Sequence, residues 1–458
     1  MAEHIARSDA PHGAPRRYQN HIIVGIFAML VPTAMALVQY KIPTIMVPLM
    51  EAFGIDASGG AWLMSVFVLM LVVMAIPVSL LCQRIGPFKV VLCATVCIAV
   101  GSIIGAFAPS YPILLASRAI EGTAACAAAV TGPVIIESCV NPQRVGTAMG
   151  IWGTWGSLGA TFSALLTPAV YNSMGMTFLW LLDAVIVILC TVLLFVIVKD
   201  PTHYNDMRAK GGARSVASAH SGAGQGGSEA SVPGAGVGAP VRFSTNDGYK
   251  PRYRDLLHRD CILVFLGFAA FNVSLLAVLS FVPTLLQLQG MDETLSGFAS
   301  TLAVMLSIIS SPVVGALSDR TGKTRLLLVI TTALLGPCVL LMYTHSDWVL
   351  WAAALLMGLV AMGCSGICVV ALMRALPYPS LKTKAMGALV TLQGVGSFVG
   401  TALVQALLGP DFSNVLVAGI VVCAICLGGA ACYALCKRID GMPQRKSKES
   451  DDQASEAA

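Results

Sequence analysis

The sequence predicts an all-α polytopic membrane protein whose twelve transmembrane helices form two six-helix bundles. Composition, the length of the apolar runs and a repeat between the two halves support this fold class. Hydrophobic residues make up 56% of the 458 residues and charged residues only 11%, whereas a soluble domain averages about 25% charged residues. A chain this long and this apolar buries its surface in lipid rather than in one large soluble core.

Twelve apolar runs reach the roughly 20 residues that a helix needs to span a bilayer. They cover residues 21–49, 60–82, 88–108, 111–138, 146–170, 177–198, 261–287, 294–317, 325–343, 348–373, 385–408 and 413–436. The runs are continuous rather than alternating, which excludes long transmembrane β-strands. Several are rich in glycine, which suits close packing of helices in lipid.

Basic residues gather on one side of the predicted membrane. The loops after the odd-numbered spans contain no Lys or Arg, whereas the opposite segments hold nearly all of the 28 basic residues. The positive-inside rule then places both termini in the cytoplasm, in a multi-pass protein of the cell (inner) membrane. The first run is long enough to span and is expected to stay as a signal anchor. The net charge of +5 lies in loops and tails, so anionic lipid is the expected partner and nucleic acid is not.

Composition also divides the chain into domains. One long polar insert interrupts the spans, and its residues 211–241 are so rich in Gly, Ala and Ser that a flexible linker is expected. The resulting parts are a cytoplasmic tail (1–20), an N-terminal six-helix bundle (21–198), a cytoplasmic linker (199–260), a C-terminal six-helix bundle (261–436) and a second cytoplasmic tail (437–458).

The two halves repeat each other. Similar basic loops follow the second and eighth spans, where Arg84 and Arg320 are 236 residues apart. The tripeptide Ala-Met-Gly opens the fifth span at residues 148–150 and the eleventh at 385–387, an offset of 237 residues. Two matches at nearly one offset indicate a duplicated unit. Because each unit has an even number of spans, the repeats are parallel, related by an axis along the membrane normal.

The second of these loops resembles the signature of a known family. Residues 315–325, Gly-Ala-Leu-Ser-Asp-Arg-Thr-Gly-Lys-Thr-Arg, match the pattern G-x-L-x-D-R-x-G-R/K-x-R/K of the major facilitator superfamily. The first loop is a degraded copy, in which Ser79 replaces the Gly and Gln83 the Asp. The resemblance implies a monomeric secondary transporter that rocks two bundles about a central site.

The loop residues are expected to act as a gate. Asp319 can pair with a cation or cap a helix N-terminus, and such a latch holds one arrangement of the bundles. The gating candidates are Arg84, Lys89, Asp319, Arg320 and Lys323. The alternative is that these residues lie beside a turn and only contribute to the excess of positive charge on the cytoplasmic side. The latch is favoured for Asp319 and Arg320, whereas the two interpretations are balanced for Arg84.

Two cations, Lys41 and Arg118, lie inside apolar runs, where a charge costs at least about 2.5–3.5 kcal/mol unless it faces a partner or a cavity. Glu121 follows Arg118 at i+3 and shares its helix face. This segment is similar to the superfamily pattern R-x-x-Q-G, with Glu in place of Gln. Either the pair only neutralises itself, or Glu121 takes a proton and frees Arg118 for an anion.

Lys41 has no acidic residue within four positions, so its partner is expected from another helix or from substrate. Its polar neighbours Gln39 and Tyr40 and the following Pro43 favour a cavity over snorkelling toward the headgroups. Gln39, Tyr40 and Lys41 are therefore candidates for substrate binding, together with Arg118. The resemblance implies that the first helix lines the central cavity.

Other polar residues within the spans complete the candidate site. Asp183 is the second proton-coupling candidate, although the resemblance places its helix at the periphery and favours structural pairing. Asn272 and Gln393 can hydrogen-bond a substrate, although bonds between helices are the commoner use.

We expect a secondary active transporter that moves a small organic or inorganic anion together with protons. The alternative is a proton-coupled multidrug exporter, which is disfavoured because Ser157 follows Gly156 where the superfamily's drug antiporters carry Gly-Pro. A channel or receptor is a third class. The sequence has no Walker A motif or nucleophilic triad, so no enzyme activity or cofactor is expected. The 14 cysteines show no metal-ligand spacing, so no metal is expected.

Overall fold

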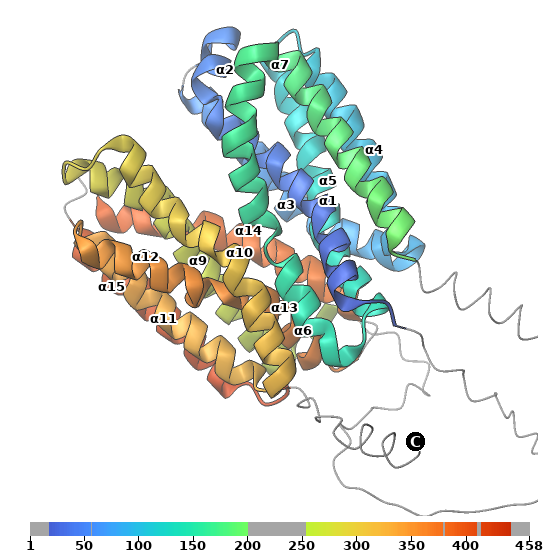
Figure 1. The fold of residues 1–458 in the computed structure, drawn as a ribbon, viewed down its shortest axis with the longest axis vertical. Coiled ribbons are helices and arrows are strands. Elements are labelled where there is room, and N and C mark those ends of the chain that lie inside the picture. Colours follow the sequence, from blue (N-terminus) through green and yellow to red (C-terminus); the bar gives the residue numbers. More distant parts are fainter. Residues whose placement is uncertain (1–17, 56, 200–252, 379–380, 410–413, 441–458) are drawn as a thin grey trace, which may run out of the picture.

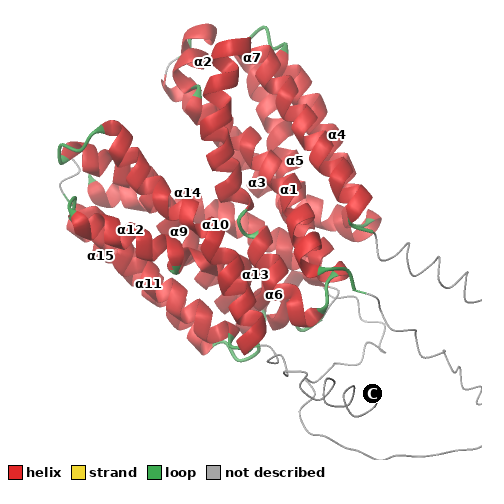
Figure 2. Ribbon diagram, viewed as in Figure 1, coloured by secondary structure: helices red, strands yellow, loops and turns green. Residues whose placement is uncertain are grey.

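The computed structural model describes residues 18–55, 57–199, 253–378, 381–409 and 414–440. The described residues form helices joined by short loops (Figure 2). The predicted linker and both predicted tails lie largely outside the described residues.

Each half of the chain forms one bundle (Figure 1). The N-terminal half contains α1 (His21–Thr44), α2 (Met46–Phe53), α3 (Ala57–Ile85), α4 (Pro87–Ala106), α5 (Tyr111–Cys139), α6 (Val145–Trp152) and α7 (Trp155–Ile197). The C-terminal half contains α9 (Arg259–Leu288), α10 (Glu293–Thr321), α11 (Thr324–Thr344), α12 (Trp348–Leu359), α13 (Cys364–Ala375), α14 (Lys382–Leu408) and α15 (Val415–Leu435).

Eleven stretches of the described residues are long and apolar enough to cross a membrane. The longest, Pro142–Ile197, covers 56 residues and turns back at Gly175. Gly175 has a φ of 80°, which a residue with a side chain rarely adopts. Figure 1 shows α7 as two arms joined by this turn. The stretch thus contains the fifth and sixth predicted spans, and the twelve-helix fold is confirmed.

Three predicted spans are interrupted. The first breaks at Ile45, two residues after Pro43. The fifth breaks between α6 and α7, and the tenth passes through a 3₁₀ turn, Ala361–Gly363, between α12 and α13. The helical irregularity expected at Pro43 is present.

The two bundles form a V (Figure 1). We call the end that carries Arg84, Arg144, Arg320 and Lys323 the basic end. The opposite end carries α2 and Gly175, with Glu51, Asp292 and Asp347, and we call it the acidic end. The described hydrogen bonds and ion pairs between the halves lie at the basic end or at mid-height in the bundles. They include Ser79 with Tyr253 (2.7 Å), Lys382 with Glu137, and Ser157 with Ser307 (2.7 Å).

The sequence repeat corresponds to two matching contacts between the halves. In the first half Gly150 packs on α10, where an added Cβ would lie 3.2 Å from the Gly315 Cα. In the second half Gly387 packs on α3, where an added Cβ would lie 2.6 Å from the Ser79 side chain. Ser79 and Gly315 occupy equivalent positions in the two basic loops. Each Ala-Met-Gly segment therefore packs against the equivalent helix of the opposite half.

Candidate functional site

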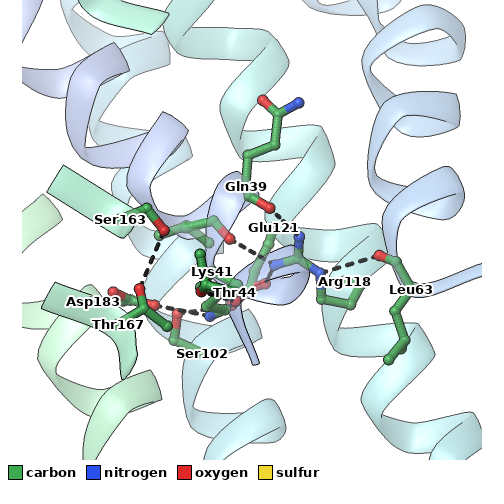
Figure 3. A network of polar contacts seen from close by, with 11 residues as sticks. Gln39, Lys41, Thr44, Leu63, Ser102, Arg118, Glu121, Ser163, Thr167 and Asp183 are labelled. Atoms are coloured by element: carbon green, nitrogen blue, oxygen red, sulfur yellow. Dashed lines mark hydrogen bonds and ion pairs between the residues drawn. The ribbon is translucent and has the colours of Figure 1, made fainter. Parts of the chain in front are cut away.

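Four charged side chains meet inside the N-terminal half (Figure 3). We call Lys41, Arg118, Glu121 and Asp183 the ion cluster. Lys41 Nζ lies 3.1 Å from Glu121 Oε1 and 2.9 Å from Asp183 Oδ2. Arg118 forms an ion pair with the second oxygen of Glu121. Three helices, α1, α5 and α7, supply these residues, and each side chain is no more than 1% exposed.

The surroundings of Arg118 hold it in place. Its guanidinium donates to the backbone carbonyl oxygens of Val38 (3.1 Å), Gln39 (3.4 Å) and Leu63 (3.4 Å). The guanidinium carbon lies 4.6 Å from the centroid of the Phe67 ring, in reach of a cation–π contact. The carbonyl of Gln39 thus belongs to the site, whereas its side chain points away from the cluster in Figure 3.

The two carboxylates differ in how many donors they accept. Glu121 accepts from Lys41, from Arg118 and from the Ser102 hydroxyl at 3.1 Å. Asp183 accepts from Lys41 through Oδ2, while its buried Oδ1 has no hydrogen-bond partner among the described residues. An unpaired buried carboxylate oxygen is costly, and a proton on it would lower that cost. Asp183 is therefore the member of the cluster that takes a proton with the least loss of bonding.

The cluster balances its own charge. With both carboxylates ionised, two cations face two anions, and this pairing offsets part of the cost of burying them. Lys41 also lies 4.0 Å from the centroid of the buried Trp180 ring. The predicted partner of Lys41 on another helix is present, and snorkelling toward the headgroups does not occur in this conformation.

A cleft of about 590 Å³ lies between the halves. Residues of α1, α5, α6 and α7 line one side, and residues of α9, α10, α13 and α14 line the other. Three predicted binding residues line it: Tyr40, Asn272 and Gln393. Three others, Lys41, Arg118 and Gln39, are not among the described lining residues, and the two cations are fully buried. The expectation that these cations face a cavity is therefore not met in this conformation.

Of the two forms expected for a latch at Asp319, a cation pair or a helix cap, the structure has the helix cap. Asp319 accepts hydrogen bonds from the backbone N–H groups of Gly146 (2.8 Å) and Thr147 (2.6 Å) and from the Thr147 hydroxyl (2.7 Å). It thus caps the N-terminus of α6 from the opposite half, instead of pairing with a cation. A carboxylate there satisfies free donors and faces the positive end of the helix dipole.

The other predicted gating residues lie at the basic end. Arg84, Lys89, Arg320 and Lys323 are exposed, and none forms an ion pair with another residue of the described chain. Glu137 and Lys382 supply an ion pair between the halves instead. Neither Glu137 nor Lys382 belongs to the loop motif from which the gating residues were predicted.

Several residues of the two sites had no sequence signal of their own. Ser102 and Trp180 contact the ion cluster, and Trp180 precedes Asp183 by one helical turn. Trp155, Phe271 and Phe298 line the cleft. In a helix that is apolar on every face, an aromatic residue that faces a cavity has the same sequence pattern as one that faces lipid or protein. The sequence pattern therefore does not show which aromatic residues line the cleft.

Comparison with known proteins identifies the family. The family model of the Major Facilitator Superfamily matches residues 24–401. Among solved structures, the fold is similar to that of the MFS proton:xylose symporter XylE bound to 6-bromo-6-deoxy-D-glucose, with a TM-score of 0.65 and 13% sequence identity. That match covers 92% of this chain and 97% of the other. The comparison with curated proteins found no match. The chain belongs to the major facilitator superfamily and is a multi-pass membrane transporter.

Proposed function

We propose that the protein is a proton-coupled secondary active transporter of the cell (inner) membrane, in which the cleft opens alternately to the two sides. The ion cluster carries this proposal. It holds two carboxylates inside the membrane region, and intramembrane carboxylates commonly mark proton pathways. Tyr40 links it to the cleft, because Tyr40 lines the cleft and directly precedes Lys41 in α1.

The orientation follows from the basic end. The positive-inside rule places that end in the cytoplasm, together with the termini. The described polar contacts between the halves lie at this end or at mid-height, so the conformation corresponds to a cleft open to the outside. Asp319 and α6, with the exposed Arg84, Lys89, Arg320 and Lys323, then form the cytoplasmic gate.

Asp183 is the proposed proton carrier, in preference to Glu121. Its free Oδ1 can hold a proton without breaking a hydrogen bond, whereas Glu121 would lose contacts with Lys41, Arg118 and Ser102. Trp180 lies beside Lys41, and Figure 3 shows the hydroxyls of Ser163 and Thr167 near Asp183. Glu121 then serves as the fixed counter-charge of both cations.

Protonation of Asp183 would leave two buried cations with one anion. An uncompensated buried charge costs several kcal/mol, so the observed arrangement becomes less stable. Movement of α1 at its break after Pro43 would relieve this by moving Lys41, and it would move Tyr40 in the cleft wall as well. Because α1 carries both Lys41 and Tyr40, its movement is the proposed coupling between protonation of Asp183 and the substrate cleft.

The anionic substrate predicted from the sequence rests on Lys41 and Arg118. Both are paired and lie outside the described cleft lining, so an anion would find a counter-charge only after the cluster rearranges. The multidrug alternative fits the volume and apolar character of the cleft. A cationic drug, however, would meet no carboxylate among the described lining residues.

Proton movement in proteoliposomes tests the proposal. The protein is reconstituted around a trapped pH dye, and a panel of uncharged, anionic and cationic compounds is added outside. We expect at least one compound to drive proton movement in the wild type, and this movement to be lost in Asp183→Asn. Glu51→Gln, at an exposed position near the acidic end, is the control and should behave as the wild type. Proton movement that persists in Asp183→Asn would refute the assigned role.

A further inference from the structure

The wall of the cleft is aromatic and apolar. Trp152 and Trp155 lie with ring centroids 6.3 Å apart on the N-terminal side. Phe268 and Phe271 stack on the C-terminal side with centroids 6.1 Å apart. All four residues line the cleft, and none of the described lining residues carries a charge. Flat apolar faces on opposite walls suit a ligand with a ring-shaped apolar body.

Part of this apolar wall is not covered by other residues of the protein in the observed conformation. Leu165 is 68% exposed, Phe298 46% and Met305 39%, and all three line the cleft. Apolar surface inside a water-accessible cleft is unfavourable, and a ligand that covers it gains the hydrophobic free energy of its removal from water. The site thus favours ligands with substantial apolar area.

Two carboxamides provide free polar groups on the C-terminal wall. Asn272 donates through Nδ2 to the Phe268 carbonyl oxygen (2.8 Å), and its Oδ1 has no hydrogen-bond partner among the described residues. Gln393 makes no hydrogen bond to any residue of the described chain. They lie on neighbouring helices, since a Cβ added to Gly396, one turn from Gln393, would be 3.6 Å from the Asn272 Cβ. An amide pair offers both donors and an acceptor without net charge.

The same wall disfavours ions. A charged ligand loses its hydration on entry, and this loss is recovered only where an opposite charge or several strong hydrogen bonds replace the water. The described lining provides no opposite charge. A sugar is also a poor fit, because many hydroxyl groups would face the Trp and Phe rings without partners.

We propose that the cleft binds an uncharged molecule with an aromatic or alicyclic body and one amide-like polar edge, held by Asn272 and Gln393. The volume of about 590 Å³ fits a ligand of drug-like size. This inference names the substrate class for the proposed transport function and rests on that function.

A matched set of probes tests the inference by calorimetric titration of the purified full-length protein. The probes share one ring system and differ in charge: 2-naphthamide (neutral), 2-naphthoate (anion) and 2-naphthylmethylammonium (cation), with D-xylose as a neutral polyol. We expect 2-naphthamide to bind at least about tenfold more tightly than either ion, and D-xylose not to bind. Gln393→Ala should weaken the binding of 2-naphthamide about threefold to tenfold.

Gln287→Ala is the matched control, because Gln287 lies on the same helix as Asn272 but its amide donates to Ser296 outside the described cleft lining. It should leave the affinity unchanged. Equal affinities for the three naphthyl probes, tighter binding of an ion or of D-xylose, or absence of 2-naphthamide binding would each overturn the inference. Binding requires no proton gradient. Loss of proton movement in proteoliposomes with intact selectivity would therefore count against the transport mechanism alone.

Discussion

At the scale of single residues, the ion cluster holds two carboxylates in unequal surroundings. Glu121 binds both cations and a hydroxyl, whereas among the described residues Asp183 binds Lys41 alone and keeps one oxygen unpaired. The two roles that we propose for these carboxylates, counter-charge and proton carrier, follow from the number of donors around each. Removal of the charge should then mainly affect stability at Glu121 and proton coupling at Asp183.

Glu121→Gln should destabilise the protein by about 3–5 kcal/mol, because Glu121 is the one described carboxylate that pairs with Arg118, which would be left buried without a counter-charge. Asp183→Asn should cost clearly less, since Lys41 keeps its contact with Glu121 and the Asn oxygen can still accept from it. Thermal unfolding of the purified variants in detergent measures the difference. Equal losses for the two variants would contradict the unequal roles.

Half of this cluster, the contact between Arg118 and Glu121, could be predicted from the sequence. Arg118 and Glu121 are three residues apart on one helix, so their contact was predictable from helical geometry. The carboxylates that hold Lys41 are 80 and 142 residues away along the chain, and only the packing of α1 against α5 and α7 brings them there. The sequence could therefore state that Lys41 needs a partner but not which one.

At the scale of helices, α6 and α10 form the contact that closes the basic end. Gly146 and Gly315 meet backbone to backbone, and Asp319 caps α6 from α10. A Cβ on Gly315 would lie 3.0 Å from the Gly146 carbonyl carbon and closer still to its oxygen. Backbone atoms cannot move aside as a flexible side chain can, so this contact tolerates no larger residue without separation of the helices.

Gly315→Ala should weaken closure of the basic end by about 1–3 kcal/mol, the usual cost of overpacking. Gly297→Ala on the same helix is the control, because no atom lies within 4 Å of its added Cβ. Hydrogen–deuterium exchange of the α6 N-terminus reports the effect. Faster exchange is expected in Gly315→Ala only; unchanged exchange in that variant would show that the contact does not hold the gate.

Helix positions were largely predictable, but the helix breaks were only partly so. Pro43 predicted an irregular helix in the first span, and the break lies two residues after it. The break between α6 and α7 occurs at Gly153, where an added Cβ would lie 2.9 Å from Ser311 and 3.0 Å from the Gly366 backbone. That break reflects packing against the other half. Such packing does not change the local pattern of apolar residues, so the sequence does not predict the break.

At the scale of the whole molecule, the internal repeat is the basis of the interface. The α6–α10 contact and the α14–α3 contact use equivalent segments of the two halves. The same residues that revealed the duplication, Gly150 and Gly387, are those that allow close approach. The superfamily fold was predictable because the repeat, the apolar runs and the loop motif agree. The cleft lining was not, because it depends on how the two bundles face each other.

The central claim is that the proton on Asp183 determines which end of the cleft is open, and distances between spin labels at the two ends test it directly. One pair replaces the exposed residues Met174 and Gln289 at the acidic end, and another replaces Gln83 and Thr321 at the basic end. The labels are attached through ketone-bearing amino acids, so all 14 cysteines remain.

Acidic buffer should shorten the Met174–Gln289 distance and lengthen the Gln83–Thr321 distance in the wild type, because protonation leaves the cluster with excess positive charge. Asp183→Asn, which mimics the protonated form, should show the acidic distances at every pH. Wild-type distances that do not change with pH, or a full pH response in Asp183→Asn, would contradict the account.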